Sequence, residues 1–455
     1  MATKPSISKG TRDFSSVEIA KRNYLKNILQ ITFEEYGFSP IETPSFEKLE
    51  TLTGVYGDEG DRLVFKILNS GEKIKRADIS AYNNGENHKF IKSISEKALR
   101  YDLTVPFARY VVQHQNELTF PFRRYQIQPV WRADRPQRGR FQEFIQCDAD
   151  IVGNRSLWQE VEVLHLYDRI FNKLRIKDVN LRINHRNILE AIITIFEDKS
   201  RIYDFTVTLD KLNKIGKKEV FKELIGKNFH SKLLDIIEKI FGLQDNFQNQ
   251  IKFLKPLFTN NQKGLEGISE LEFITNSFKL CSSDSVVLKF DFSLARGLNY
   301  YTGMIVEADS PKNINIGSIG GGGRYDNLTS VFGMDEMSGV GVSFGFERIF
   351  LVMDQLGLFP DNLSYSTKVL FINFGDSAAE IAYSYMMKLR DKNVSSELYP
   401  TAAKLNKQLA YANSKGIKSV ILMGSNEIRK KVFELKDMDS GKQTTYSLSK
   451  LINLF

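Results

Sequence analysis

The chain has 455 residues, which is too long for one ordinary domain, and its apolar content of 42% suffices for several packed cores. The net charge of +8 permits a polyanionic partner such as a nucleic acid but does not require one. Two cysteines, Cys147 and Cys281, give no disulfide framework and no metal-ligand spacing, and no apolar run approaches the roughly twenty residues that cross a bilayer. The first residues lack the apolar core of a secretory signal, so we expect a cytoplasmic protein.

The first strongly periodic segment covers residues 17–36, where apolar side chains recur at helical spacing until Gly37 ends the pattern. Residues 38–46 are then extended, and Pro40 and Pro44 restrict them to the edge of a sheet. The polar residues 8–14 precede the helix, and we assign them no chemistry.

Residues 58–68 alternate weakly and predict a strand, whereas the polar residues 70–98 predict a loop or insertion. Asp102 and Thr104 follow, just before Pro106, which is well placed to start a helix that runs to residue 113. On local grounds Asp102 is as well explained by a helix-start acid that accepts orphan N–H groups as by a ligand contact.

Residues 121–153 have the pattern of a β-hairpin with a long basic loop. The first strand covers 124–131 and ends at Arg132, and the second covers 141–152 and carries Phe144, Gln146 and Asp150. The loop between them contains Arg135, Arg138 and Arg140. An edge hairpin with solvated arginines is the simpler interpretation, but it leaves Arg132 unexplained at the end of a hydrophobic strand, because an unpaired cation is costly there. The guanidinium fork suits phosphate oxygens.

Residues 157–174 predict a helix and residues 181–184 a strand. Residues 186–288 are rich in Ile, Leu, Phe and Lys at helical spacing, so we expect a helical insertion. Its basic run, 211–232, is better explained by a solvated helix face than by contact with a nucleic acid.

Two strand-like runs in residues 287–307 flank a turn that contains Arg296, Tyr300 and Tyr301. The glycine-rich residues 319–328 predict a close-packed turn, and they are not a phosphate loop because no Gly-Lys-Ser/Thr follows. Residues 339–354 pass from an extended run into a helix that begins at Glu347-Arg348, which alone would indicate a helix-start ion pair. Beyond the polar linker 356–366, strands and helices alternate as in a small α/β domain with a mostly parallel sheet.

Three of these segments together resemble the class II aminoacyl-tRNA synthetases. The extended run with Pro44 is similar to motif 1, the hairpin with Arg132, Asp134 and Phe144 to motif 2, and Gly339 to Arg348 to motif 3. Two further runs narrow the resemblance to the histidyl-tRNA synthetase family: residues 135–140 (RPQRGR) and residues 296–301 (RGLNYY). The family usually has Asp where this chain has Asn299.

The resemblance implies an α+β catalytic domain on a mixed, mainly antiparallel sheet flanked by helices. The expected domains are residues 1–185 and 289–357 for the catalytic core, 186–288 for the helical insertion, and 366–455 for a C-terminal α/β anticodon-binding domain. A homodimer with Pro44 at its interface is also implied.

The implied activity is a histidine–tRNA ligase that activates L-histidine with ATP and then esterifies it to tRNA(His), with Mg²⁺ as cofactor and no assigned protein ligands for the metal. The resemblance assigns catalysis to Arg132 and Arg296, and ATP binding to Arg132, Arg140, Phe144 and Arg348. It assigns histidine binding to Asp102, Thr104, Gln146, Asp150, Arg296, Tyr300 and Tyr301, and tRNA binding to Arg135 and Arg138.

Two alternatives remain open at this point. A non-catalytic, histidine-binding regulatory paralogue of a phosphoribosyltransferase would keep the amino-acid pocket and lose the ATP and tRNA parts, whereas this chain keeps Arg132, Arg296 and Arg348. A class II synthetase for proline, threonine or glycine would not be expected to carry residues 296–301 as they stand.

Overall fold

The computed structural model describes residues 4–53, 61–243, 247–283, 285–295, 301–361, 363 and 367–455, which form two compact units. The first unit contains most of the chain up to Pro360, and the second is built mainly from residues after Asp361. The two units have separate cores, because no buried hydrophobic cluster contains residues from both.

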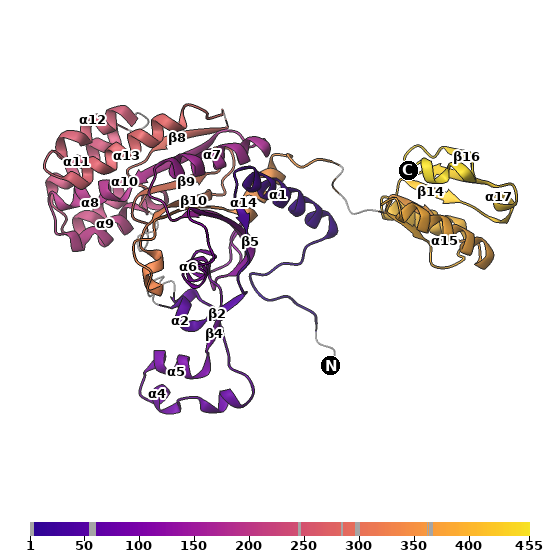
Figure 1. Ribbon diagram of the computed structural model, residues 1–455, viewed down its shortest axis with the longest axis horizontal. Helices are drawn as coiled ribbons and strands as arrows, with labels where there is room; N and C mark the ends of the chain where they lie inside the picture. Colours follow the sequence, from indigo (N-terminus) through magenta and orange to yellow (C-terminus); the bar gives the residue numbers. More distant parts are fainter. Residues whose placement is uncertain are drawn as a thin grey trace. The chain divides into compact units, whose positions relative to one another are not determined.

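An eight-stranded sheet forms the centre of the first unit (Figure 1), in the order β1-β5-β6-β11-β10-β9-β7-β8. Only the two outer pairs, β1 with β5 and β7 with β8, are parallel, so the sheet is mixed and mainly antiparallel, as predicted. The strands are β1 (Ser39–Pro40), β5 (Phe122–Trp131), β6 (Glu143–Val152), β7 (Val179–His185), β8 (Val286–Phe290), β9 (Met304–Asp309), β10 (Ser318–Tyr325) and β11 (Gly339–Phe344).

The predicted hairpin is confirmed as β5 and β6, which pair from Phe122↔Val152 to Trp131↔Glu143. Successive side chains on a strand point to opposite faces, so this register gives the two faces of the sheet different compositions. One face carries Tyr125, Cys147 and Ala149, and these residues are buried in the main hydrophobic core.

Helices α1 (Ser16–Glu35) and α7 (Trp158–Lys173) cover that apolar face. Phe33 of α1 packs against Tyr125 at 5.3 Å between ring centroids, and Tyr167 of α7 packs against Phe344 of β11 at 4.5 Å. Both helices were predicted within two residues of their ends. Their apolar stripes therefore fix which face of the sheet is left for polar side chains.

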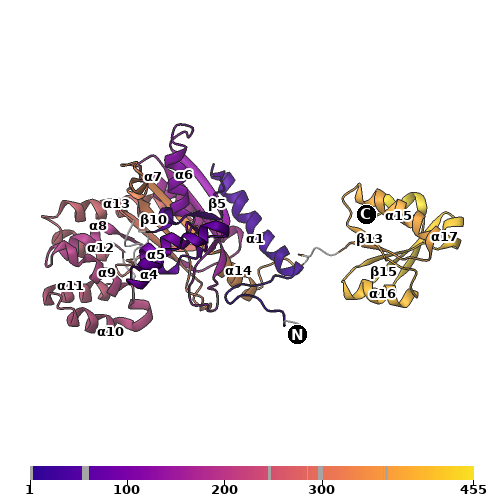
Figure 2. The ribbon, with the colours of Figure 1, turned by 90° about the horizontal axis from the view of Figure 1, so that it is seen from below.

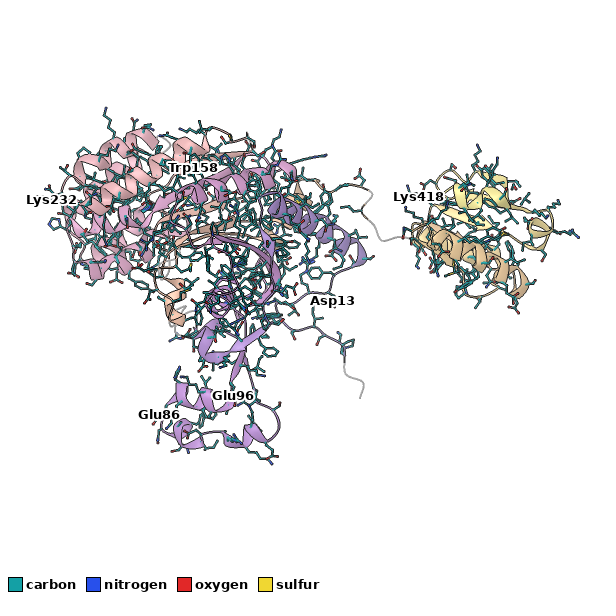
Figure 3. The ribbon with its side chains drawn as sticks, in the orientation of Figure 1. Asp13, Glu86, Glu96, Trp158, Lys232 and Lys418 are labelled. Atoms are coloured by element: carbon teal, nitrogen blue, oxygen red, sulfur yellow. The ribbon has the colours of Figure 1, made fainter. Side chains whose placement is uncertain are left out.

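A group of helices lies between β7 and β8 in the chain and gathers at one side of the sheet (Figures 1 and 2). Lys232, in the basic run, lies exposed on the outer edge of this group (Figure 3). The helices are α8 (Arg186–Thr194), α9 (Ile202–Leu209), α10 (Leu212–Gly226), α11 (Ser231–Gly242), α12 (Phe247–Leu257) and α13 (Gln262–Phe278).

Residues 70–98, predicted to be a loop or insertion, form an insertion with helices of its own rather than a loop. These residues form a lobe that projects from the small sheet β2-β4-β3 and contains Glu86 and Glu96 (Figures 1 and 3). Its helices are short, with five residues in α4 and eight in α5, so helical periodicity in the sequence did not reveal them. The elements are β2 (Phe46–Lys48), α2 (Leu49–Leu52), β3 (Lys66–Ile67), η1 (Gly71–Arg76), α4 (Ile79–Asn83), α5 (Asn87–Ile94) and β4 (Lys97–Leu99).

The strand predicted for residues 58–68 is only partly correct, because the described residues 61–63 are helical and β3 covers Lys66–Ile67. The glycine-rich run was predicted to be a turn, but it is the strand β10. Gly322 explains why glycine suits a strand here: a Cβ would lie 2.2 Å from the Gly341 carbonyl oxygen on β11.

The remaining elements of the first unit are α6 (Thr104–Gln113), η3 (Leu328–Phe332) and α14 (Phe346–Gln355). The strand-to-helix transition predicted for residues 339–354 is confirmed by β11 and α14. The η2 turn (Lys199–Arg201) lies between α8 and α9.

The second unit has a five-stranded sheet in the order β13-β12-β14-β15-β16. Strand β12 is parallel to β13 and β14, but β15 and β16 are antiparallel, so the sheet is less parallel than predicted. Its elements are β12 (Val369–Phe371), α15 (Asp376–Arg390), β13 (Ser396–Leu398), α16 (Leu405–Ser414), β14 (Ser419–Leu422), α17 (Ser425–Arg429), β15 (Val432–Asp437), β16 (Gln443–Ser447) and η4 (Leu448–Asn453). Among the described residues of both units, no helix is long and apolar enough to cross a bilayer.

Candidate active site

The second face of the central sheet is polar, and strand register decides which side chains meet on it. Arg124 is paired with Asp150, and Gln128 with Gln146, across β5 and β6. The neighbouring strand β11 places Gly341 beside Asp150. Buried polar side chains on adjacent strands are costly unless they have partners, so this face is a candidate site.

Arg132 lies where β5 ends, and two hydrogen bonds and two aromatic rings hold its guanidinium. Its Nε donates to the Tyr101 carbonyl oxygen at 2.9 Å, and its Nη2 donates to Gln146 Oε1 at 3.0 Å. The guanidinium carbon also lies 4.4 Å from the ring centre of Tyr101 and 5.2 Å from that of Phe144. Arg132, Gln146 and Phe144 are therefore brought together, as the sequence predicted.

Gln146 connects Arg132 to a buried carboxylate. Its Nε2 donates to Asp148 Oδ2 at 3.0 Å, and only 9% of Gln146 is exposed. Burial raises the pKa of Asp148, while Arg124 and a hydrogen bond from Ser343 oppose that rise.

Asp150 lies deeper on the same face, where two protein groups hold its carboxylate. Arg124 Nη2 is 2.7 Å from Oδ2, and the Tyr325 hydroxyl donates to Oδ1 at 2.5 Å. Burial raises the pKa of Asp150 to about 6, and Arg124 is the main group that limits the rise. Asp150 is therefore mostly ionised at neutral pH and can accept a hydrogen bond.

Tyr301 lies beside a pair of glycines that also adjoins Asp150. A Cβ on Gly323 would lie 3.0 Å from Tyr301 Cδ1, and Gly323 pairs with Gly341, where a Cβ would lie 1.8 Å from Asp150 Oδ1. These two glycines, on the adjacent strands β10 and β11, therefore leave room for the side chains of Tyr301 and Asp150.

Asp102 and Thr104 lie at the start of α6. Asp102 Oδ1 accepts a hydrogen bond from the Val105 N–H at 3.2 Å, which is the helix-start contact considered from the sequence. Asp102 also contributes to the raised pKa of Asp150, so the two carboxyl groups are neighbours. Thr104 is half-buried at the first position of the helix.

The loop between β5 and β6 presents further arginines. Asp134 accepts hydrogen bonds from Arg140 Nε at 3.0 Å and forms an ion pair with its Nη2 at 2.9 Å, which anchors Arg140 at the base of the loop. Arg135 and Arg138 are exposed.

Arg348 of α14 lies against the same loop. Its Nη1 donates to the Ser318 carbonyl oxygen at 2.6 Å, and a Cβ on Gly139 would lie 3.5 Å from Arg348 Cγ. Its neighbour Glu347 is held by Arg22 of α1, with Nη–Oε distances of 2.6 and 2.7 Å. Because the Ile145 N–H also donates to Glu347 at 3.4 Å, α14 is joined to the start of strand β6.

Two of the predicted site residues, Arg296 and Tyr300, lie outside the described residues, as do Gly297 and Asn299. The segment that leads toward them begins at Asp291. Asp291 accepts a hydrogen bond from Arg182 Nη1 at 2.8 Å, and Ser293 donates to Asp291 through its hydroxyl at 2.6 Å.

A hollow of about 650 Å³ lies away from these residues, between α6 and the segment that includes β2 and α2. None of the residues predicted to bind ATP or histidine lines it. It includes three acidic side chains, Glu42, Glu47 and Glu50, which suit a nucleotide phosphate poorly. We therefore place the candidate site on the polar face of the sheet rather than in this hollow.

Three residues of the site were missed from the sequence. Arg124 and Tyr325 hold Asp150, and Arg22 holds Glu347. The alternation of Arg124, Gln126 and Gln128 along β5 was a usable signal, because it matches the polar alternation on β6. No comparable signal exists for Arg22, whose partner lies 325 positions away.

The arrangement combines cations suited to a polyphosphate with an acceptor for a polar ring. Arg132, Arg140 and Arg348 surround the loop end, and Asp150 and Tyr301 lie further along the face. No group of three or more His, Cys, Asp or Glu side chains able to hold a metal occurs in the described part of the chain.

Comparisons with known proteins agree with this geometry. The histidyl-tRNA synthetase family profile matches residues 87–349, and an anticodon binding domain matches residues 368–455. A histidine–tRNA ligase of Christiangramia forsetii is 55% identical over 99% of both chains, and one of Flavobacterium johnsoniae is 48% identical over 98% of both. The crystal structure of histidyl-tRNA synthetase from Nostoc is 27% identical, with a TM-score of 0.80 over 100% of this chain and 99% of that one.

Proposed function

This chain belongs to the histidyl-tRNA synthetase family, and we infer from that membership that it is an ATP-dependent histidine–tRNA ligase. The enzyme first joins histidine to the α-phosphate of ATP, with release of pyrophosphate, and then transfers histidine to the 3′ end of tRNA(His). The observation that carries this conclusion is identity of 55% along almost the whole chain to a histidine–tRNA ligase.

In the activation step the histidine carboxylate attacks the α-phosphate, so two anions must be brought together. Fixed cations lower the barrier by stabilising charge on the phosphate oxygens in the transition state. We assign this role to Arg132, because hydrogen bonds to Tyr101 and Gln146 hold its guanidinium in place before the substrate arrives. Arg296 is the second proposed catalytic cation, bridging the carboxylate and the α-phosphate.

The rest of the nucleotide is assigned to the residues around the loop. Arg348 would bind the distal phosphates, Arg140 would bind beside it, and Phe144 would stack on adenine. The position of Gly139 against Arg348 supports a shared phosphate site at this end of the sheet. Phe144 already lies beneath the guanidinium of Arg132, which supports a stacking role.

Histidine selection is assigned to the other end of the polar face. A neutral imidazole has one donor nitrogen and one acceptor nitrogen. Asp150 would accept from the ring and Tyr301 would donate to it, with Gln146 and Tyr300 nearby. Asp102 and Thr104 would bind the α-amino group, and the proximity of Asp102 to Asp150 supports this assignment. A site with buried polar groups rejects substrates that leave those groups unpaired.

We propose Mg²⁺ as the cofactor that accompanies ATP. At nucleotide sites Mg²⁺ is often bound by one or two carboxylates together with the phosphate oxygens of the substrate. When bound, the ion would neutralise phosphate charge. Arg132 and Arg348 would act on the oxygens that it leaves free.

The transfer step is assigned to the exposed loop arginines and the second unit. Arg135 and Arg138 would contact the acceptor end of tRNA(His), and the anticodon-binding unit would contact its anticodon. We further propose a homodimer whose interface includes Pro44 and the hollow that it lines. A cytoplasmic location is proposed for an enzyme that uses tRNA, and its two cysteines are free in the structure.

The experiment that tests the proposed function is ATP–pyrophosphate exchange with each amino acid in turn. Histidine alone should support exchange by the wild-type enzyme. Arg132→Ala and Arg296→Ala should each lose roughly 10²- to 10³-fold in rate while retaining the far-ultraviolet circular dichroism of the wild type. Arg155→Ala is the matched control, because Arg155 is exposed and lies at the opposite end of the hairpin.

Exchange with histidine separates the alternatives. The regulatory paralogue would bind histidine but catalyse no exchange, and a different synthetase would exchange with another amino acid. The comparisons favour the ligase over both alternatives.

A further inference from the structure

Strand β5 carries two consecutive arginines that face opposite sides of the sheet. Arg123 lies on the apolar side, with its guanidinium 4.8 Å from the ring centre of Phe38 and 2.5 Å from Glu162. Arg124 lies on the polar side, 4.2 Å from the ring centre of Phe107 and 2.7 Å from Asp150. The two side chains thus have the same chemistry and the same kinds of neighbour, but only Arg124 adjoins the proposed imidazole site.

Arg124 is inaccessible to a substrate. Its exposed fraction is 0%, and its guanidinium lies between the ring of Phe107 on α6 and the carboxylate of Asp150 on β6. Any effect of Arg124 on histidine must therefore pass through the residues that it touches. Arg124 forms its ion pair with Asp150, and its charge also lowers the pKa of Asp148 on the same strand.

Several titratable groups surround the Asp150 carboxylate. Arg124 approaches from β5, Asp148 lies on the same strand, the Tyr325 hydroxyl approaches from β10, and Asp102 lies before α6. Burial and the two neighbouring acids raise the pKa of Asp150, whereas Arg124 and the Tyr325 hydroxyl lower it. Of the groups that lower the pKa of Asp150, Arg124 has the largest effect, so without it the carboxyl group would hold a proton to a higher pH.

We propose that Arg124 is a positioning residue for histidine recognition: it keeps Asp150 ionised and fixed, so that the carboxylate accepts the N–H of the substrate's imidazole ring. This inference rests on the proposed function and adds to it a residue that never touches the substrate. Arg124 and Tyr325 hold one carboxylate oxygen each, so the orientation of Asp150 is set before histidine binds.

Loss of Arg124 should weaken histidine binding and leave ATP binding nearly unchanged. A protonated Asp150 would offer a hydroxyl where the ring N–H needs an acceptor, so histidine should bind more weakly. The nucleotide is assigned to Arg132, Arg140 and Arg348 at the loop end and should be affected little. A hydrogen bond to a charged group contributes enough that its loss should weaken binding roughly 10- to 100-fold.

The test measures ATP–pyrophosphate exchange by the full-length enzyme carrying Arg124→Met, which removes the charge and retains much of the side-chain volume. The KM for histidine should rise about 10-fold or more, while the KM for ATP stays within about two-fold. In the wild type the acid limb of kcat/KM for histidine should fall near pH 6, where Asp150 and the imidazole of the substrate both ionise. In Arg124→Met the limb should move to higher pH, because protonated Asp150 then persists further whereas the ionisation of the substrate is unchanged.

Two further variants control for folding and for charge. Arg123→Met loses an adjacent, ion-paired arginine from the other face, and its histidine KM and pH limb should match those of the wild type. Arg124→Lys retains a cation and should recover most of the histidine affinity at neutral pH. If Arg124→Met does not fold, the double variant Arg124→Met/Asp150→Asn buries neither charge and should bind histidine as weakly as Asp150→Asn alone.

The possible results have distinct meanings. A wild-type enzyme without histidine-dependent exchange would refute the proposed function itself. Normal wild-type exchange with Arg124→Met indistinguishable from Arg123→Met would overturn the inference alone. A double variant that binds histidine more weakly than Asp150→Asn would also overturn it, because Arg124 would then act independently of the carboxylate.

Discussion

Gly341 lies where the packing of the polar face leaves no room for a side chain. A Cβ at this position would lie 1.8 Å from Asp150 Oδ1 and 3.3 Å from Tyr325 Cε1. Gly341 therefore allows the Asp150 carboxylate to lie close to β11, and any larger residue at position 341 must displace that carboxylate.

We expect Gly341→Ala to raise the KM for histidine by roughly 10-fold or more, because the displaced carboxylate loses its alignment with the ring. Histidine-dependent exchange measures the effect. Gly226→Ala is the control, since a Cβ at Gly226 would meet nothing within 4 Å. Equal histidine KM values for the two variants would show that Asp150 is not held through Gly341.

The two cysteines differ in their surroundings, which predicts different reactivity. Burial raises the pKa of the Cys147 thiol, and the charge of Asp148 adds to the rise, whereas Cys281 is exposed. Thiolates are the reactive form, so Cys147 should stay inert in the native enzyme. A chromogenic disulfide reagent should titrate one thiol in the native protein and two in denaturant. Rapid reaction of both native thiols would contradict the burial of Cys147.

At the residue scale, the sequence predicted which residues of the hairpin come together better than it predicted the residues that support them. Arg132, Gln146 and Phe144 lie together as expected, because they are close in one hairpin. Arg124 and Tyr325 were missed because their link to Asp150 depends on strand register and on a partner 175 positions away. The placement and role of Arg296 stay a prediction.

Helix α1 is fixed to α14 by a buried ion pair that no local pattern indicates. Arg22 donates to both carboxylate oxygens of Glu347 and lies 4.1 Å from the ring centre of Phe14. The adjacent Lys21 forms an ion pair with Asp354, but those side chains are 29% and 49% exposed. Two neighbouring pairs thus join the same two helices in different environments.

We expect Arg22→Ala to destabilise the first unit by about 3–5 kcal/mol, because it leaves Glu347 buried without its cation. Lys21→Ala should cost no more than about 1 kcal/mol, because water and salt already screen its pair. Urea unfolding, followed by the fluorescence of Trp131 and Trp158, compares the two variants. Similar losses for both would contradict a special role for the buried pair.

At the element scale, long amphipathic segments were predicted well and short ones poorly. Helices α1 and α7 and strands β5 and β6 agree with the sequence because each has an apolar face along its length. The helices of residues 71–94 bury little, and β10 is a glycine-rich strand whose side chains provide no alternation. Local sequence patterns could not identify these helices or β10, because contacts with neighbouring strands and loops determine their structure.

The second unit has an exposed aromatic residue at the carboxyl end of its parallel strands. Phe374 follows β12 and is 44% exposed, while the adjacent Asn373 is bound through Nδ2 to the Tyr399 carbonyl oxygen at 3.0 Å. Gln408, which is fully buried, also bonds to both backbone groups of Asn373. A rigid support beneath an exposed ring suits stacking on an unpaired base.

We expect Phe374→Ala to raise the KM for tRNA(His) roughly 10-fold in aminoacylation without changing ATP–pyrophosphate exchange, because only the transfer step needs the anticodon. Tyr383→Ala is the matched control, since Tyr383 is 50% exposed on α15, away from that strand end. Equal tRNA KM values for the two variants would exclude Phe374 as a stacking platform.

At the scale of the whole molecule, the sequence predicted the fold class and a separate C-terminal α/β unit, and both are confirmed. It overestimated the parallel character of the second sheet, because β15 and β16 were not recognised as strands. The charge of +8 permitted a nucleic-acid partner but could not locate its surface, since basic residues occur in both units.

A crystal structure of the enzyme with histidine and a non-hydrolysable ATP analogue tests the central claim most directly. We expect the imidazole ring within about 2.6–3.2 Å of an Asp150 oxygen and the α-phosphate beside the Arg132 guanidinium. A ring bound away from Asp150, or a nucleotide in the hollow lined by Glu42, Glu47 and Glu50, would contradict this assignment.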